Sequence, residues 1–300
     1  MRYLGLAVLA LTAPLAVSPP LAAQNPAVFT ASSAWALDYG DDYCRLMRDF
    51  ERGSDTIGLF IERTQPGPMM RLIVVGDAVR LYRGAQEIGY RLHPSGTVRT
   101  APRLVHRTTE GQQYLNLGPV MLAEMASPAP GGAPAMPPPY NRQAEAELAG
   151  KITGIALERG VTSPVIVETG SLGEAIGALQ ACADDLLASW GLDAEKHKNL
   201  SRPAMPAQPT AGWIARDTIP FGDFAKLSGG NNEIRVQIDK SGKATSCHIQ
   251  WPALDRAIND KICASVMQNS SFMPALDQEG QPLDSFWTAN VFFLMPPFGP

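Results

Sequence analysis

The stretch 233–293 begins with a strict alternation of apolar and polar residues. Its apolar positions are Ile234, Val236 and Ile238, and charged or amide side chains stand between them. A period of two is typical of a half-buried strand. Residues 240–243 then read KSGK, a polar turn whose glycine can adopt positive φ, and a second strand is expected from there to Trp251. The pattern predicts two strands joined by a tight turn.

A helix and a final strand follow in the same stretch. Pro252 has a fixed φ that suits the first turn of a helix. Apolar residues recur at steps of three and four from Leu254 to Met267, as they do along one helix face. Residues 286–294 are rich in β-formers and precede prolines. The pattern predicts a small β-β-α-β domain over residues 213–300.

Short apolar runs separated by glycine and proline fill the preceding region, residues 28–192. Strands are expected after an opening turn near Trp35 and at four further places, 56–63, 70–75, 79–82 and 87–92. Their spacing is typical of an antiparallel sheet or a partial barrel. The proline-rich run 127–139 is interpreted as a surface loop or internal linker, and residues 193–212 as the linker to the C-terminal domain.

One strong helix is expected in this first domain. Residues 171–174, read as Ser171, Leu172, Gly173 and Glu174, form a capping-box pattern in which the serine accepts from first-turn amides and the glutamate reaches back. Apolar residues follow at helical spacing to Trp190, and Gly191 is placed to end the helix. The expected fold class is therefore α+β: a β-rich N-terminal domain with one packed helix, then the small C-terminal domain.

Composition restricts the compartment and the partners. The chain has 300 residues, enough for two domains, and its net charge of −4 gives no indication of nucleic-acid binding. Four cysteines allow three pairings, and the segmentation favours Cys44 with Cys182 and Cys247 with Cys263. Zinc is the alternative use, but no two cysteines have C-x-x-C spacing. Disulfides are typical of exported proteins.

The N-terminal residues are expected to direct export. The apolar run Leu4–Val17 is shorter than the roughly 20 residues that span a bilayer. Arg2 precedes this run and Leu21-Ala22-Ala23-Gln24 follows it, which is typical of a signal peptide, residues 1–23, cleaved near Ala23. We therefore expect a periplasmic protein. The competing interpretation is an uncleaved segment that anchors the chain in the inner membrane.

Four short motifs stand in the C-terminal stretch. They are Asp239-Lys240-Ser241-Gly242, Leu254-Asp255, Phe272-Met273-Pro274-Ala275 and Gly280-Gln281-Pro282. In this order and at similar spacing they resemble the motifs of TonB-type C-terminal domains, which are periplasmic binding modules. The resemblance covers the last quarter of the chain and implies a disulfide-bearing variant of that domain, with Cys247 on the second strand and Cys263 on the helix.

The resemblance also implies a way of binding. The last strand of a TonB-type domain commonly lies at a sheet edge, where it pairs with a short extended segment of an outer-membrane receptor. The implied partner is such a receptor or another envelope protein. The implied partner-binding residues are Phe286, Trp287, Val291 and Phe293. The competing interpretation places these residues in the core or in a homodimer seam.

The chain departs from an energy-transducing TonB-type protein. Such a transducer keeps a membrane helix with a functional histidine and a long proline-rich spacer, whereas the run Leu4–Val17 contains no histidine. The usual tyrosine-proline pair ahead of the first strand is missing, and Ile219-Pro220 stands nearest to its place. Coupling to an inner-membrane motor for transmembrane transport is therefore not expected.

Candidate catalytic and metal-binding residues are sparse. The histidines, which are His93, His106, His197 and His248, lack metal-ligand spacing. Asp38, Asp41 and Asp42 offer oxygen ligands for calcium but lack the EF-hand spacing, so we interpret them as a solvated turn. Glu168-Thr169-Gly170 is similar to the aspartic-protease D-T-G turn without its aspartate. No catalytic residue, cofactor or metal is expected.

The sequence thus favours a non-enzymatic envelope protein that binds a protein partner. Two alternatives stay open. The first is an exported enzyme or stress protein with its activity in the N-terminal domain, and the second is a structural envelope protein that self-associates.

Overall fold

The fold is mixed and rich in strands. The computed structural model describes residues 25–124, 140–215, 218–220, 231–251 and 256–292, which contain four helices and many short strands. The expected class, a broadly α+β fold rich in strands, is therefore confirmed. The expected signal peptide, 1–23, and the proline-rich run, 127–139, lie outside the described residues.

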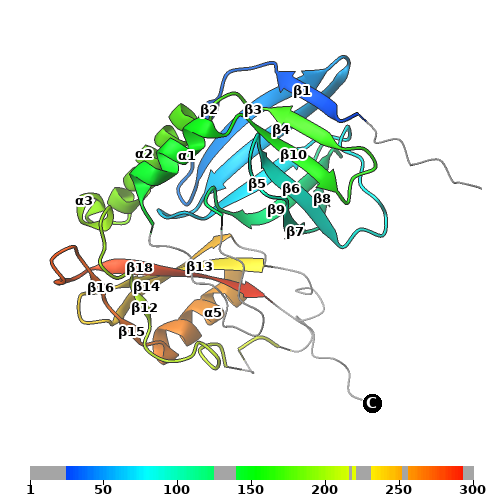
Figure 1. Ribbon diagram of the computed structural model, residues 1–300. Coiled ribbons are helices and arrows are strands. Elements are labelled where there is room, and N and C mark those ends of the chain that lie inside the picture. The colour runs from blue at the N-terminus through cyan, green and yellow to red at the C-terminus, as the bar shows by residue number, and fades with distance from the viewer. Residues whose placement is uncertain (1–24, 125–139, 216–217, 221–230, 252–255, 293–300) are drawn as a thin grey trace, which may run out of the picture.

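A first domain is built around one large sheet that curls until it is nearly closed (Figure 1). Its strands are β1 (Ala27–Ala31), β2 (Ala36–Tyr39), β3 (Cys44–Arg52), β4 (Asp55–Arg63), β5 (Met70–Val75), β6 (Glu87–His93), β7 (Arg99–Pro102), β8 (Leu104–Arg107), β9 (Gln113–Val120), β10 (Gly154–Arg159) and β11 (Val165–Glu168). Their order in space is β7-β6-β10-β11-β1-β3-β4-β5-β9-β8, with β2 paired to β3. β1 and β11 run parallel.

One expected strand of this domain is absent. The stretch 79–82 forms only an isolated bridge, between Leu81 and Val161. Arg80 and Tyr82 are exposed, and the chain turns at once after them, so few apolar side chains are available to extend a ladder. The other strands expected between residues 56 and 92 correspond to β4, β5 and β6.

Two helices, rather than the one expected, pack on this sheet. They are α1 (Arg142–Lys151) and α2 (Gly173–Ser189), which lie side by side in Figure 1. α1 begins at Asn141, whose side chain accepts a 2.9 Å hydrogen bond from the amide of Ala144. Its sequence, RQAEAELAGK, has few apolar residues and buries only Glu145 and Ala149. It therefore lacks the apolar stripe by which helices are recognised in a sequence.

The predicted capping box of α2 is found in part. The cap residue is Leu172, which makes no side-chain cap bond, but the hydroxyl of Ser171 accepts a 3.3 Å hydrogen bond from the amide of Gly173, as expected. The same hydroxyl donates to the carbonyl of Gly150, 3.1 Å away at the end of α1. The expected end of α2 is confirmed, because Gly191 follows the cap residue Trp190 with a φ of 78°.

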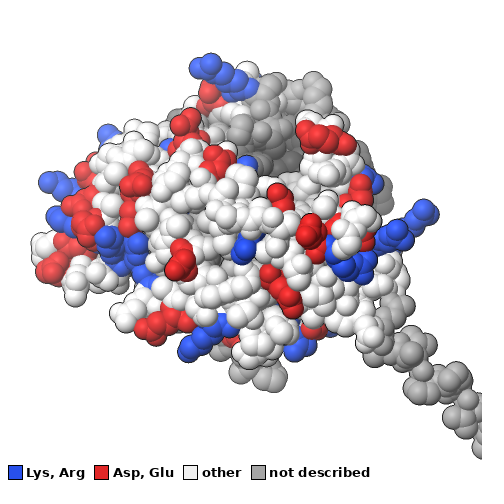
Figure 2. Space-filling model, turned by 90° about the horizontal axis from the view of Figure 1, so that it is seen from above, with Lys and Arg blue, Asp and Glu red and all other residues white. Residues whose placement is uncertain are grey.

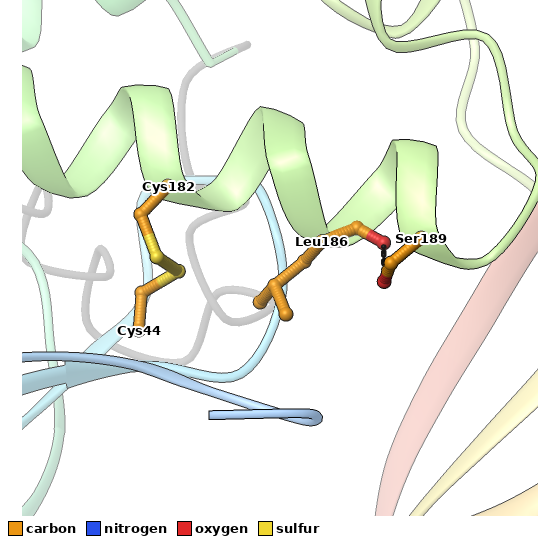
Figure 3. Close-up of a disulfide and its surroundings, with 4 residues drawn as sticks. All are labelled: Cys44, Cys182, Leu186 and Ser189. Atoms are coloured by element: carbon orange, nitrogen blue, oxygen red, sulfur yellow. Dashed lines mark hydrogen bonds between the residues drawn. A yellow bond between two sulfur atoms is a disulfide. The ribbon is translucent and has the colours of Figure 1, made fainter. Parts of the chain in front are cut away.

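A disulfide joins α2 to the sheet (Figure 3). Cys182 is bonded to Cys44 at the start of β3, with Cα atoms 5.9 Å apart and both side chains buried. One turn further along, Leu186 points to the same side of the helix. Cys247 is bonded to Cys263 in the C-terminal domain. The pairing favoured by the sequence is therefore the pairing in the structure.

A buried polar cluster joins α1 and α2 to β4. Arg63, fully buried at the end of β4, is paired with Glu145 of α1. Glu145 also accepts hydrogen bonds from Tyr140 (2.9 Å) and from the amide of Gln180 on α2 (2.8 Å). Burial raises the pKa of Tyr140 to about 12, and the charge of Glu145 adds to the rise. The cluster satisfies a charge that would otherwise be costly to bury.

The C-terminal domain consists of a three-stranded sheet covered by one helix. The sheet order is β14 (Ala244–Trp251), β13 (Asn231–Ile238) and β18 (Ser285–Phe292), and α5 (Arg256–Asn269) packs on one face. Ile234, Val236 and Ile238 form the centre of the core, as the alternation predicted. The smaller strands are β15 (Phe272–Met273), β16 (Ala275–Leu276) and β17 (Pro282–Leu283).

The turn between β13 and β14 requires its glycine. Gly242 has a φ of 88°, and a Cβ at this position would collide with the carbonyl oxygen of Phe272. Asp239 caps the turn by accepting hydrogen bonds from the amides of Ser241 (2.8 Å) and Lys243 (3.1 Å). This turn therefore fixes the place of β15 against the sheet.

The segment 193–212, expected to be a linker, carries structure of its own. It contains α3 (Ala194–His197) and β12 (Met205–Pro206), and β12 pairs with β15. Ala204 and the adjacent Trp213 are buried in the C-terminal core. Much of the segment thus packs on the domain that it introduces.

Candidate functional site

β18 is an edge strand, which makes its backbone the first candidate for a binding site. It pairs with β13 from Ser285 opposite Ile238 to Phe292 opposite Asn231. Among the described residues, no strand pairs with its other side. An edge strand presents amide and carbonyl groups that can accept another extended chain.

The two described aromatic residues of β18 have partners within the chain. The ring of Trp287 packs against those of Trp213 (5.3 Å) and Phe272 (5.6 Å) in the C-terminal core. Phe286 points to the opposite face and packs edge-on against Trp190, at 5.3 Å. The side chain of Val291 and all of Phe293 lie outside the described parts, and the role of these four residues in partner binding stays a prediction.

The polar face of the C-terminal sheet rests on the first domain. This face consists of Glu233, Arg235, Gln237, Ser246, His248, Gln250, Phe286 and Thr288. The sequence pattern alone would place such a face in solvent, yet Glu233 is only 5% exposed and Arg235 only 8%. In Figure 1 the sheet lies directly beneath the first domain. The polar face is thus an interface between the domains.

A chain of alternating charges runs through this interface. Arg71 of β5 is paired with Glu233 and, at 2.7 Å, with Glu62 of β4. Glu62 is buried and also accepts a 2.6 Å bond from Arg45. Thr64 donates a 2.5 Å hydrogen bond to Glu233. Because each carboxylate has at least two donors, the charges are compensated where water is excluded.

Asp42 and Arg235 form a second contact in the interface. Arg235 is bonded to Asp42 at 3.0 Å, and its guanidinium lies 3.8 Å from the ring centre of Trp190, close enough for a cation–π contact. The other oxygen of Asp42 is 2.6 Å from Nε2 of His248. Burial alone would raise the pKa of Asp42, but the contacts with His248 and Arg235 outweigh it and lower that pKa.

Two further contacts hold β18, one at its first residue and one at its middle. His197 of α3 lies with Nε2 3.0 Å from the hydroxyl of Ser285 and stacks on Phe286. Burial lowers the pKa of His197, although its contact with Asp193 opposes this. In the middle of the strand, Thr288 donates a 2.6 Å hydrogen bond to Gln65. Ser285, Phe286, Trp287 and Thr288 thus all have side-chain contacts, and within the described residues no strand pairs with the outer edge of β18.

The predicted acidic cluster does not converge on one point. Asp38 accepts a hydrogen bond from Tyr43 at 3.0 Å, while Asp42 turns to Arg235 and His248. No group of three or more His, Cys, Asp or Glu side chains in the described ranges is arranged to hold a metal ion. Glu168-Thr169-Gly170 forms the turn between β11 and α2, with Gly170 at a φ of 65°.

The sequence did not reveal the interface residues. Glu62, Arg71, Glu233 and Arg235 stand on strands at positions where a charged side chain normally faces water. They come from segments more than 150 residues apart, which only the tertiary structure brings together. The one local signal is the pair Glu233 and Arg235, two charges on the same face of a strand.

Neither the distribution of surface charges nor the comparisons with known proteins identify a ligand. Seen from above in Figure 2, basic and acidic side chains are interspersed rather than gathered by sign. No helix in the described residues is both long and apolar enough to cross a bilayer. No family model, curated protein or solved structure matches the chain.

Proposed function

We propose that this protein is an exported envelope protein whose C-terminal domain, residues 213–300, binds an extended segment of a protein partner along β18. The observation that carries the proposal is the edge position of β18. The motifs of the C-terminal domain resemble those of TonB-type domains, which bind partners by pairing an edge strand with an extended segment. The two disulfides fit an oxidising compartment such as the periplasm.

Backbone pairing would supply most of the affinity. A partner strand added to β18 gains main-chain hydrogen bonds, while alternate side chains give specificity. Phe286 and Trp287 then act by fixing the strand, since each already has a ring contact on its own face. Val291 and Phe293, nearer the C-terminal end, are assigned to direct contact with the partner by the resemblance alone.

The partner class follows from the same resemblance. We assign an outer-membrane receptor or another envelope protein as the partner, and no energy coupling. The charged interface supports this assignment, because it fixes the C-terminal sheet on the first domain instead of leaving it at the end of a long spacer.

The proposal is tested by capture from a detergent extract of cell envelopes. The residues of β18 that exchange ladder bonds with β13 are Ser285, Trp287 and Ala289, so the amide of Thr288 faces away from β13. Thr288→Pro removes this outward amide, and Thr288→Val, which keeps the amide and loses only the hydroxyl bond to Gln65, is the matched control. We expect capture to be lost with Thr288→Pro and kept with Thr288→Val. Circular dichroism shows whether each variant is folded.

Hydrogen exchange on the unaltered chain provides a second measurement. Amides of β18 should gain protection when the captured partner is bound, and those of β14 should not. Equal protection of both strands, or of neither, would falsify binding along β18.

A further inference from the structure

A trough on the outer face of the first domain lies apart from β18. It consists of two cavities, of about 500 and 410 Å³, that share His93 and Ile166 and so form one continuous hollow. The combined size is that of a small-molecule site. The opposite side of the same strands faces the core, where Leu92 and Ile155 are buried.

Small residues on β10 form the floor of the trough. The strand register sets His93 beside Gly154 and Arg91 beside Ala156, which in turn lies beside Ile166. Gly154 has no side chain and Ala156 has a single methyl group, so the side chains of β6 and β11 stand as two walls. Neighbouring strands are about 4.8 Å apart, which separates these walls by roughly 10 Å.

Two opposite charges at one end of the trough, Arg48 and Glu168, have no ionic partner in the part of the chain that the structure describes. Arg48 is held by backbone carbonyls only, with Nε 2.7 Å from Ser33 and Nη1 2.9 Å from Thr169. The backbone of Glu168 pairs with β1, but its carboxylate has no hydrogen-bond or ion-pair partner among the described residues. Both line the same cavity, so a fixed cation and a free anion face a ligand together.

The other end of the trough has several apolar residues, and its arginine and glutamate are paired with each other. Pro26, Pro94 and Pro164 line it, and Arg91 there is paired with Glu158 at 2.9 Å. A ligand that fills the trough therefore needs both charges at one end and an apolar group at the other.

We infer that this trough binds a small zwitterion, an α-amino acid with an apolar side chain. Its carboxylate accepts hydrogen bonds from Arg48, and its ammonium group donates to Glu168. Its side chain lies over Gly154 and Ala156. Arg48 is preorganised for this contact, because two carbonyls and the nearby rings of Trp35 and Phe50 fix its guanidinium.

Calorimetric titration of the full chain tests the inference. The probes are L-leucine, L-leucine amide, which lacks the carboxylate, and N-acetyl-L-leucine, which lacks the ammonium group. We expect leucine to bind. Each derivative should bind with an affinity lower by roughly tenfold or more, because each loses a charge-assisted hydrogen bond. Equal binding of all three would overturn the inference, as would no binding of leucine, phenylalanine or glycine.

Substitutions in the trough test where leucine binds. Glu168→Gln should weaken leucine binding by roughly tenfold and leave N-acetyl-L-leucine unchanged. Glu87→Gln, an exposed carboxylate on β6 outside the trough, is the matched control and should change neither. Ala156→Leu should abolish binding by filling the trough. Thermal unfolding should be unchanged in Glu168→Gln, since that side chain is exposed; unchanged leucine affinity in this variant contradicts the assigned site.

Discussion

The first domain surrounds a core to which β1 to β11 and α2 all contribute, whereas the C-terminal domain has a small core around Val236 and rests its polar face on its neighbour. The disulfide of the first domain joins residues 138 positions apart, and that of the C-terminal domain residues 16 apart. Charges are distributed differently too. Arg63 is compensated within the first domain, but Glu233 is compensated by residues of the other domain.

This difference indicates which domain depends on the other. The buried charges Arg63 and Glu62 of the first domain are both paired within that domain. Among the described residues one helix, α5, covers one face of the C-terminal sheet, and the first domain covers residues of the other face such as Glu233 and Arg235. These contacts fix the orientation of the C-terminal sheet, and with it the position of β18, relative to the first domain.

Removing the disulfides should give the largest effects and rank the two domains. Replacing Cys44 and Cys182 by alanine should lower the free energy of unfolding of the first domain by about 5 kcal/mol, because a long loop is released in the unfolded chain. Replacing Cys247 and Cys263 should lower that of the C-terminal domain by about 3 kcal/mol. Urea unfolding followed by residue-resolved hydrogen exchange separates the domains, and a reversed ranking would refute the loop argument.

Breaking the charged interface should destabilise the C-terminal domain selectively. Glu233→Ala removes the acceptor of Arg71 and Thr64, and we expect a loss of about 2–3 kcal/mol, the range for hydrogen bonds to charged groups. Glu279→Ala, at an exposed position in a turn, is the control. Hydrogen exchange of β13 reports the loss. If both variants behave alike, the two domains are energetically independent.

The sequence predicted the parts whose signals are local. The alternation from Ile234 to Ile238, the turn at Gly242 and the end of α2 at Gly191 were all found, because period-two patterns and positive-φ glycines act over a few residues. It did not predict α1, which has few apolar residues to indicate its packing. It also placed the cap of α2 one residue early, since the cap residue is Leu172, although Ser171 does accept a bond from the amide of Gly173.

The candidate site was predictable only as a strand. The position of β18 followed from its β-formers, but the contacts of Phe286 with Trp190 and of Thr288 with Gln65 join segments far apart in the chain. Nothing in a single strand indicates which face another domain will cover. The edge itself is a property of the sheet order, which a sequence pattern does not contain.

Acid should weaken the interface as Asp42 is protonated. Because the pKa of folded Asp42 lies below its ordinary 3.8, its contacts with Arg235 and His248 contribute fully well above that pH and are lost as the pH falls through the lower, folded value. Asp42→Asn should cost about 1–2 kcal/mol at neutral pH and flatten this acid dependence. The measurement is C-terminal-domain stability against pH, with Asp41→Asn, an exposed neighbour, as the control. An unchanged acid limb in Asp42→Asn would remove this contact from the interface energetics.

Alkaline titration should provide the smallest effect and report on the first domain alone. Folded Tyr140 has its pKa raised to about 12, so the folded state keeps the phenol proton where the unfolded chain, with an ordinary pKa of 10.0, releases it. The stability that this difference in pKa contributes to the folded state is fully present below pH 10.0 and is lost as the pH rises towards about 12. Tyr140→Phe should cost about 1 kcal/mol, the hydrogen bond to Glu145, and remove one late-titrating tyrosine from the ultraviolet difference spectrum. Tyr39→Phe, an exposed tyrosine, is the control. If Tyr140→Phe instead destabilised the C-terminal domain, the first domain would not be the self-contained unit that its buried cluster indicates.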